Sequence, residues 1–164
     1  MQVEELMNRE VATCQRDHTL DCTVRIMLEQ DCGIVPIVDE LSRVIGVLTD
    51  RDVCIAAYTQ GRPIQEIPAW SVMSRHVHTC RADDPIERAE QIMREHRVRR
   101  LPVTDRGGRL LGLLSLSDIA RHLRLVGIPT TKGLDPMEIS LTLEAVSKPH
   151  PHMTTHVPEH LAMR

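Results

Sequence analysis

The 164-residue chain has almost no aromatic side chains: it holds no phenylalanine, one tryptophan (Trp70) and one tyrosine (Tyr58). A stacking surface for single-stranded nucleic acid therefore lacks its usual residues. The net charge of −3 is also unlike that of proteins that follow phosphate backbones, so we expect no nucleic-acid partner. Eighteen of the twenty basic residues are nevertheless arginine, a side chain that suits local sites for phosphate or carboxylate.

Long apolar runs are missing as well. No segment approaches the roughly 18 consecutive apolar residues of a membrane helix. The first residues, Met-Gln-Val-Glu-Glu-Leu, have neither the basic nor the apolar part of a secretory signal. We therefore expect a cytoplasmic protein with no membrane partner.

The sequence also lacks the usual cysteine and catalytic motifs. Its five cysteines are odd in number and form no Cys-x-x-Cys pair, so we predict reduced thiols and no metal site. Gly-x-Ser-x-Gly, His-Glu-x-x-His and a Walker phosphate loop are all absent, which predicts no catalytic residues and no enzyme. The cysteines are Cys14, Cys22, Cys32, Cys54 and Cys80.

What the chain does contain is an internal repeat. Shifted by 66 positions, residues 7–54 align with residues 73–120 without a gap, and identical pairs include Pro36 with Pro102 and Asp52 with Asp118. Each copy is too small to bury a sizeable core alone. The repeat therefore predicts two similar units that pack about a pseudo-twofold axis and leave a cleft at their seam.

Each copy has the pattern strand, helix, strand, strand, helix. Leu20, Thr23, Ile26 and Met27, like Ile86, Ala89, Ile92 and Met93, recur at helical spacing. Asp84-Pro85 predicts a capped helix start. Strands are expected around Pro36 and Pro102, where proline indicates a sheet edge or an interrupted ladder. We expect an α/β (α+β) fold of two βαββα units.

We place the first repeat at residues 5–62, the second at 63–125 and a C-terminal extension at 126–164, with residues 60–70 as the linker. The start signal Asp135-Pro136-Met137-Glu138 predicts a helix in the extension, although Ile139, Leu141 and Leu143 alternate like a strand. The segment from Lys148 onward is rich in histidine and proline and is expected to be disordered.

The motifs Val35-Pro-Ile-Val-Asp39 with Gly46-Val-Leu-Thr-Asp-Arg-Asp52, and Leu101-Pro-Val-Thr-Asp105 with Gly112-Leu-Leu-Ser-Leu-Ser-Asp118, resemble the signature of CBS domains. Together the two copies are similar to a tandem CBS pair, or Bateman module, over roughly residues 5–125. This resemblance implies a regulatory module with no obligatory cofactor. Its ligand would be an adenosine nucleotide such as AMP, ADP or ATP, or S-adenosylmethionine, bound at the seam.

The resemblance also implies two clefts. Asp52 and Asp118 would accept hydrogen bonds from ribose hydroxyls, and Thr49 and Ser115 would contact ribose or phosphate, because a carboxylate only accepts and a diol donates twice. Arg51 would hold a phosphate in the first cleft, and Arg99, Arg100, Arg121 or Arg124 in the second. The base would lie against strand residues and backbone from Thr13, Cys14, Ile34, Val35 and Pro36, or from Thr79, Cys80, Arg100, Leu101 and Pro102.

Asp50-Arg51 of the first copy is replaced by Leu116-Ser117 in the second, which predicts unequal clefts. The same Thr-x-x-Asp and Ser-x-x-Asp motifs are also ordinary helix capping boxes that need no ligand. A second reading is therefore a structural dimerisation scaffold with empty clefts. A third is a thiol or metal stress sensor that uses Cys14, Cys80 and the histidine-rich tail.

The resemblance further implies a homodimer, for which the stripes Val53-Ala56-Ala57 and Ile119-Leu123 are candidates. Because no effector domain fits in the 39 residues after Leu125, any signal would pass to an unknown effector protein on another chain. A ligand that favours one orientation of the two units would change the surface that this partner contacts.

Overall fold

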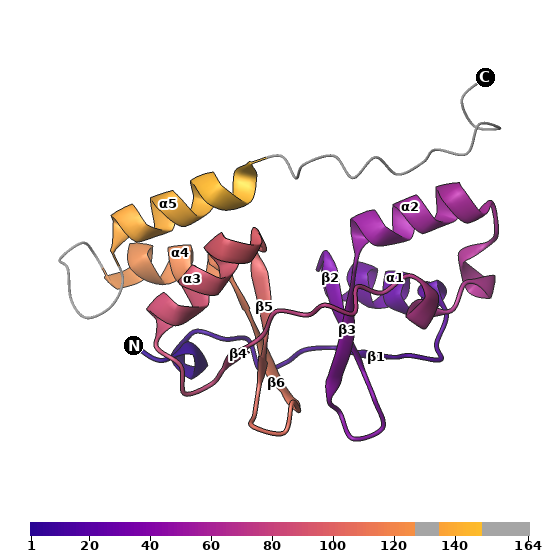
Figure 1. Cartoon of the computed structure of the whole chain (residues 1–164), viewed down its shortest axis with the longest axis horizontal. Helices are drawn as coiled ribbons and strands as arrows, with labels where there is room; N and C mark the ends of the chain where they lie inside the picture. The colour runs from indigo at the N-terminus through magenta and orange to yellow at the C-terminus, as the bar shows by residue number, and fades with distance from the viewer. Residues whose placement is uncertain (127–134, 149–164) are drawn as a thin grey trace.

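The structure is a computed structural model that describes residues 1–126 and 135–148, with side chains up to residue 122 and from residue 135. Two similar units lie side by side (Figure 1). The predicted disorder and the histidines of the tail fall at residues 149–164, outside the described part. Among the described residues, no helix combines the length and the apolar character that a membrane span requires.

The first unit follows the predicted order. Its elements are β1 (Cys14–Gln15), α1 (Leu20–Glu29), β2 (Ile34–Val38), β3 (Val44–Thr49) and α2 (Asp50–Gln60). Strand β2 is central, parallel to β1 and antiparallel to β3. Because β1 pairs only with Ile37 and Val38, Pro36 lies where the ladder is interrupted, which confirms the expectation from its missing N–H.

The second unit repeats this arrangement with β4 (Cys80–Arg81), α3 (Ile86–His96), β5 (Arg100–Thr104), β6 (Leu110–Ser115) and α4 (Leu116–Val126). Its strand order β4-β5-β6 and its register match those of the first sheet, including a register shift before the last residue of the central strand. The predicted α/β class and the βαββα order are therefore confirmed in both copies.

One helix start differs from the prediction. Helix α3 begins at Ile86 after Pro85, and no side chain caps its first turn. Asp84 instead accepts a hydrogen bond of 2.8 Å from the backbone N–H of Arg81, so its carboxylate closes the turn before the helix. The prediction that Asp84 caps this helix is wrong, because its carboxylate is hydrogen-bonded within the preceding turn.

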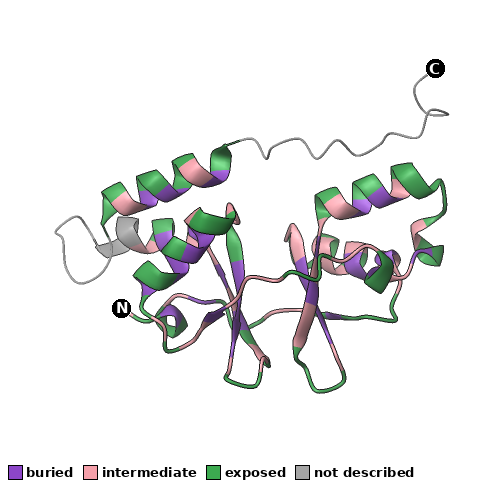
Figure 2. Cartoon of the chain, in the orientation of Figure 1, coloured by how far each residue is buried: buried purple, intermediate pink, exposed green. Residues whose placement is uncertain are grey.

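The extension carries α5 (Pro136–Ser147), which begins where the start signal placed it. The Asp135 carboxylate accepts from the N–H of Met137 at 2.9 Å. Ile139, Thr142 and Val146 are buried, and α5 packs against α3 and α4. The strand-like alternation was misleading because Leu141 and Leu143 remain exposed (Figure 2).

Each unit is completed by a strip of chain from the other repeat. We call residues 1–8 and 67–74 the lead segments. The first contains the short 3-10 helix η1 (Val3–Glu5) and lies on the second unit, where Asn8 pairs with Leu113 and Val3 donates to the carbonyl of Asp84 at 3.0 Å. In Figure 1 the chain starts beside α3 and then crosses to the first unit.

The second lead segment does the same for the first unit. The segment 60–70, expected as a linker, contains the 3-10 helix η2 (Ile64–Glu66) and the start of a second one, η3 (Ala69–Ser71), which forms part of this strip. Ile67 and Ala69 are fully buried in the first core, and Ser74 pairs with Val47 of β3. The two strips are therefore exchanged between the units.

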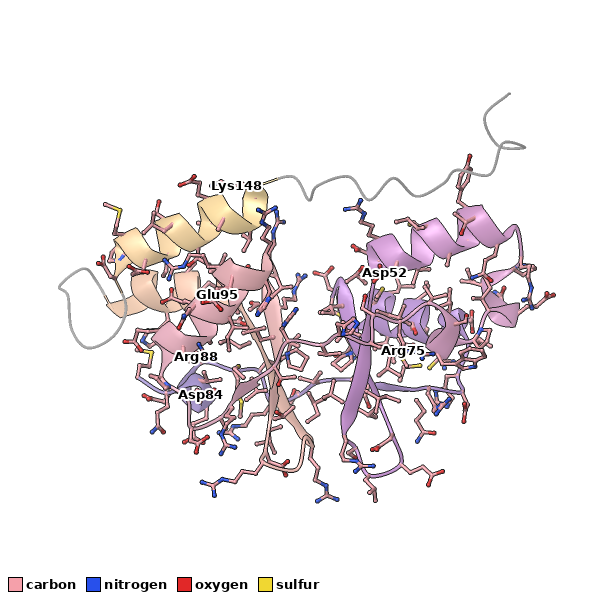
Figure 3. All side chains as sticks on the ribbon, in the orientation of Figure 1. Asp52, Arg75, Asp84, Arg88, Glu95 and Lys148 are labelled. Carbon is pink, nitrogen blue, oxygen red and sulfur yellow. The ribbon has the colours of Figure 1, made fainter. Side chains whose placement is uncertain are left out.

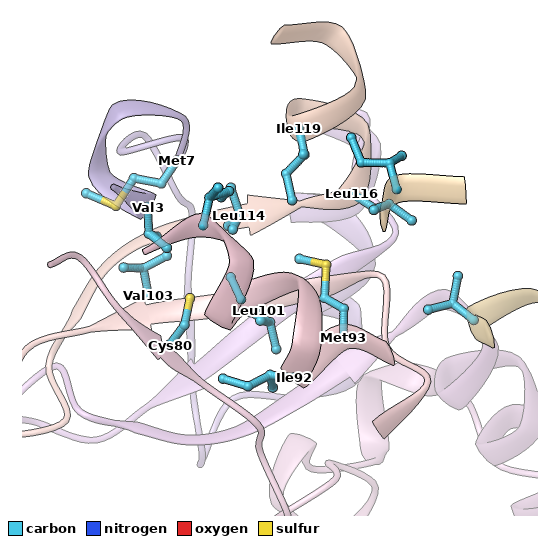
Figure 4. Close-up of a cluster of buried hydrophobic side chains, with 14 residues drawn as sticks. Val3, Met7, Cys80, Ile92, Met93, Leu101, Val103, Leu114, Leu116 and Ile119 are labelled. Carbon is cyan, nitrogen blue, oxygen red and sulfur yellow. The ribbon is translucent and has the colours of Figure 1, made fainter. Parts of the chain in front are cut away.

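Two aliphatic cores result, one per unit. The second core surrounds Met93 and Leu101 and includes Val3 and Met7 from the exchanged strip (Figure 4). A buried leucine or isoleucine side chain stabilises a fold by about 1.5–3 kcal/mol. Val53, Ala56 and Ile119 are buried in these cores, so they cannot supply the dimer stripes predicted for them; Ala57 is half-buried, and the side chain of Leu123 lies outside the described part.

The units also touch at their hairpin tips. The backbone N–H of Val44 donates to the carbonyl of Gly108, and that of Leu110 donates to the carbonyl of Ser42, both at 3.0 Å. Gly108 has φ +81, a left-handed conformation that glycine adopts without strain. These contacts and the exchanged strips hold the two units next to each other.

Candidate functional site

The first candidate site begins at the turn from β3 into α2. Thr49 caps α2: its hydroxyl accepts from the N–H of Asp52 at 3.2 Å, and Asp52 Oδ2 accepts from the backbone N–H and the hydroxyl of Thr49 at 2.9 and 2.7 Å. The capping reading of this motif is therefore present. Asp52 Oδ1, by contrast, has no hydrogen-bond partner among the described residues, so one acceptor atom is left for a ligand.

A cavity of about 680 Å³ lies beside this turn, between the two units. Thr49 and Asp52 lie on one side, with Ile34 placed next to Thr49 by the strand register. The opposite side comes from the second repeat. In Figure 3, Asp52 at the start of α2 and Lys148 after α5 lie on opposite sides of this space. The second-repeat residues that line it are Ser74, His76, Val77, His78, Arg97, Val98, Arg99, Arg100 and Pro102.

The charge of this cavity is predominantly positive. Five cationic side chains line it, against the two carboxylates of Asp50 and Asp52. The amino end of α2 adds positive potential, which favours a bound anion. A phosphate group is thus better suited to this cavity than a cation is. The five are Arg51, Arg97, Arg99, Arg100 and Lys148.

His78 brings a titratable group to the same wall. Its ring stacks on that of His96, with centroids 3.6 Å apart and planes 9° from parallel. Burial, followed by the nearby His96 and His76, lowers the pKa of His78 below its ordinary value of 6.5. At neutral pH His78 is therefore uncharged, and the arginines supply the positive charge of this wall.

The second candidate site repeats the turn but not the opening. Asp118 Oδ2 accepts from the N–H and hydroxyl of Ser115 at 2.9 and 2.6 Å, and its Oδ1 is paired with Arg121. The adjoining cavity is about 360 Å³, and Asp118 is not among the residues that line it. Leu143 and Ser147 of α5 line it instead, beside Ser115 and Arg100. The cavities are unequal, as the Asp50-Arg51 difference predicted.

The structure gathers only part of the sequence-predicted site. Six residues line the first cavity: Ile34, Thr49, Arg51, Asp52, Arg100 and Pro102. Ser115 and Arg100 line the second cavity, and Asp118 lies beside it. Arg99 also lines both, Arg121 pairs with Asp118, and the side chain of Arg124 lies outside the described part.

The other predicted residues lie elsewhere. Val35 and Leu101 are fully buried and, like Cys14 and Cys80, belong to the two cores, while Pro36 is buried in β2. Thr13 is exposed and Thr79 half-buried, and neither lines either cavity. Strand alternation explains the core residues, since the neighbours of Ile34 and Arg100 point to the opposite face.

The residues missed were His76, His78 and Arg97. They come from the second repeat, which supplies the wall of the first cavity opposite Asp52. The signal was available at the repeat offset, where the corresponding positions are Glu10, Ala12 and Asp31. The change from Glu10 and Asp31 to His76 and Arg97 at matched positions indicated where the second repeat gained basic residues.

Cys14 and Cys80 lie in separate cores, so the reading that joined them in one thiol sensor is not supported by their placement. Burial raises the pKa of Cys14 to about 11 and that of Cys80 to about 12. Both thiols are therefore protonated at neutral pH, and a protonated thiol is a poor nucleophile.

Comparison with known proteins places these features in a family. The CBS domain family model matches residues 3–58 and 69–125. The chain therefore belongs to the CBS domain family, and with two such domains it forms a tandem pair.

The chain is 33% identical over 118 residues to the CBS domain-containing protein YhcV of Bacillus subtilis, spanning 72% of this chain and 82% of that protein. It is 36% identical over 120 residues to Hypoxic response protein 1 of Mycobacterium tuberculosis, spanning 73% and 82%. A crystal structure of Hypoxic Response Protein I with two coordinated zinc ions superposes with a TM-score of 0.69 at 32% identity, covering 75% of this chain and 99% of that one.

The CBS domain pair of protein MJ0100, solved with 5'-methylthioadenosine and S-adenosyl-L-methionine, superposes with a TM-score of 0.68 at 22% identity, covering 77% and 98%. This likeness supports the fold. The Bateman module architecture expected from the sequence is thus confirmed.

Proposed function

We propose that this protein is a regulatory module that binds an adenosine nucleotide in the first cavity and passes the ligand state to a partner protein. The proposal rests on one observation: a hydrogen-bond acceptor and a group of basic side chains line the same cavity of about 680 Å³. The acceptor is Asp52 Oδ1, and the basic side chains include Arg97, Arg99 and Arg100. The family and the adenosine compounds held by the similar MJ0100 pair support this choice of ligand.

Within this proposal, Asp52 accepts a ribose hydroxyl, and the arginines and the amino end of α2 hold the phosphates. The five cationic side chains favour AMP, ADP and ATP over S-adenosylmethionine, whose sulfonium is itself a cation. Affinity is expected to rise with the number of phosphates, because each adds negative charge facing the same wall.

The test is calorimetric titration and thermal shift with ATP, ADP, AMP and S-adenosylmethionine, with Asp52→Ala and Asp118→Ala as matched variants. Both substitutions remove a capping box of the same geometry, so both lower stability similarly, by about 1 kcal/mol. Asp52→Ala should abolish the nucleotide-induced shift and Asp118→Ala should preserve it.

A second variant addresses the basic wall. Arg100→Ile installs the residue that the first repeat carries at the corresponding position, Ile34. It should weaken ATP binding more than AMP binding. No response of the wild-type protein to any adenylate would instead favour the scaffold reading, and loss of binding only in Asp118→Ala would place the ligand in the second cavity.

To pass the ligand state on, this protein would have to contact other chains. We propose that it forms a homodimer and that the dimer contacts an effector protein. Ile55 and Tyr58 of α2 are 48% and 64% exposed, on the helix that starts at Asp52's turn, so a ligand there would act on the same helix. Light scattering of wild-type protein and of Ile55→Glu tests this: the dimer should dissociate in the variant. A wild-type monomer would refute the dimer while leaving the ligand proposal standing.

A further inference from the structure

Away from the cavities, three soft-metal ligands converge at the edge of the first unit. Cys14 is the first residue of β1, His18 lies in the turn that follows this strand, and Cys22 lies in the first turn of α1. His18 Nδ1 is 3.5 Å from Cys14 Sγ and 3.4 Å from Cys22 Sγ, and all three atoms lie within 4.8 Å of one another. Two sulfurs thus approach one ring nitrogen.

The two S···N distances fit a shared metal ion. With Zn–S near 2.3 Å and Zn–N near 2.05 Å, a tetrahedral ion sets S···N at about 3.6 Å and S···S at about 3.8 Å. Hydrogen bonding explains the cluster less well. A single Nδ1 offers one lone pair or one hydrogen, so it can bond only one of the two thiols at a time.

The turn that carries these ligands is held in place by the second lead segment. The carbonyl of His18 accepts from the N–H of Ala69 at 2.7 Å, and the carbonyl of Arg16 accepts from the N–H of Trp70 at 3.2 Å. Leu20 donates to the carbonyl of Ile67 at 2.8 Å. Since the backbone is fixed on both sides of His18, the ligands need little rearrangement to close around an ion.

The second unit lacks this cluster. At the repeat offset, Cys14 corresponds to Cys80, but His18 corresponds to Asp84 and Cys22 to Arg88. Asp84 is engaged by the N–H of Arg81, and Arg88 donates to Gln91 at 3.0 Å; both are labelled in Figure 3. Only the buried thiol is common to both repeats, so the ligand set belongs to the first unit and is not part of the repeated core.

We propose that Cys14, His18 and Cys22 form a site for Zn²⁺ or a similar thiophilic divalent cation, with the fourth coordination position open to water. On binding, the metal takes the place of the two thiol protons, which pass to solvent, and no electron transfer occurs. His18 is exposed and Cys22 half-buried while Cys14 is buried, so the ion can enter from the surface. An open fourth position is typical of zinc that exchanges or binds a further ligand rather than of a closed structural site.

The experiment uses the full-length reduced protein titrated with Co²⁺ and then Zn²⁺ alone. Wild-type protein should bind one Co²⁺ per chain with the visible bands of tetrahedral cobalt and a thiolate-to-cobalt charge-transfer band, and Zn²⁺ should displace it. Cys22→Ser and His18→Gln should each weaken binding by more than about 100-fold, beyond the range for loss of a supporting residue. Circular dichroism confirms that both variants fold.

The matched control is Cys80→Ser, which removes the equivalent buried thiol of the second unit and should leave the cobalt spectrum unchanged. A variant with His150, His152, His156 and His160 replaced by asparagine separates this site from the tail. Retained thiolate bands in that variant support the proposal. A spectrum without thiolate bands, binding indifferent to Cys22→Ser, or binding lost with the four histidines would each overturn it. None of these outcomes depends on nucleotide binding.

Discussion

The two clefts share one backbone and differ in charge. In the first, the wall opposite Asp52 includes His76 and Arg97. At the repeat offset, those positions hold Glu10 and Asp31. The strand register and the capping boxes are the same in both units. Duplication has therefore kept what folds each half, while residues outside the shared fold have diverged, and the second repeat now gives the first cavity a basic wall.

The largest effect is expected where the exchanged strips meet the sheets. A Cβ at Gly112 would lie 2.7 Å from the backbone carbonyl of Asn8, whereas one at Gly46 would meet only the side chain of Met73, as near as 2.5 Å. A backbone strip cannot move aside as a methionine can. Gly112→Ala should lower the free energy of unfolding by about 3 kcal/mol and Gly46→Ala by about 1 kcal/mol.

Urea denaturation of the two variants measures this difference. Equal losses would show that both strips yield to the same degree, and the contrast between backbone and side-chain contacts would not hold.

The next effect concerns a carboxyl that only the second unit buries. Glu90 of α3 is 1% exposed, and its Oε1 has no hydrogen-bond partner among the described residues. Burial, followed by the nearby Glu138, raises its pKa from 4.5 to about 7. The repeat counterpart is Val24, which has no charge to bury.

Because the folded pKa lies above the unfolded value, burial of Glu90 costs stability that builds up as the pH rises from 4.5 to about 7 and is constant above that. Glu90→Gln should therefore be about 2 kcal/mol more stable than wild type at pH 8 and nearly equal to it at pH 5. Thermal unfolding across this pH range provides the measurement. A difference that is constant with pH would mean that the pKa of Glu90 is the same in the folded and unfolded states, and the raised pKa would be refuted.

A smaller loss of stability, equal in the two units, is expected at the helix caps. Thr49→Ala and Ser115→Ala each remove the hydroxyl of a capping box and should each cost about 1 kcal/mol. Chemical denaturation without nucleotide compares them. A marked inequality would show that the turns themselves differ, and that charge is not the main distinction between the clefts.

The smallest effect concerns the histidine stack beside the first cavity, for which the first unit has Ala12 and Gln30 at the matched positions. His78 has a lowered pKa, so the folded state resists its protonation and loses stability as the pH falls below 6.5. His78→Ala should flatten the decline in melting temperature between pH 7.5 and pH 5.5. An unchanged decline would assign that pH dependence to other groups.

Much of the architecture could be predicted because it depends on local patterns that occur twice. Helical spacing identified the core faces at Leu20 and Ile86, and the proline strands located the hairpins. The exchange of the lead segments could not be predicted, because it depends on which sheet Asn8 and Ser74 reach and not on their own sequence neighbourhood. The sequence therefore predicted the side of the cleft that carries Thr49 and Asp52, but not the histidines and Arg97 on the opposite side.

The Cys14, His18 and Cys22 cluster escaped prediction for a related reason. Equal spacings of four read as one face of a helix, yet Cys14 lies in a strand and His18 in a turn. The convergence comes from the turn between β1 and α1, and no Cys-x-x-Cys motif signals it. A strand, a turn and the first turn of a helix bring these three residues together, and helical periodicity does not encode that change of conformation.

The exchanged strips make the halves mutually dependent. A chain cut near residue 62 would separate each sheet from the strip that covers it. The hydrophobic surfaces that Met73 and Met7 cover, at Gly46 and Gly112, would then be exposed to water. Neither fragment would be a smaller version of the whole, and each would need the other in order to fold. The chain therefore joins in one molecule an exchange of strips like that by which two identical chains form a swapped dimer.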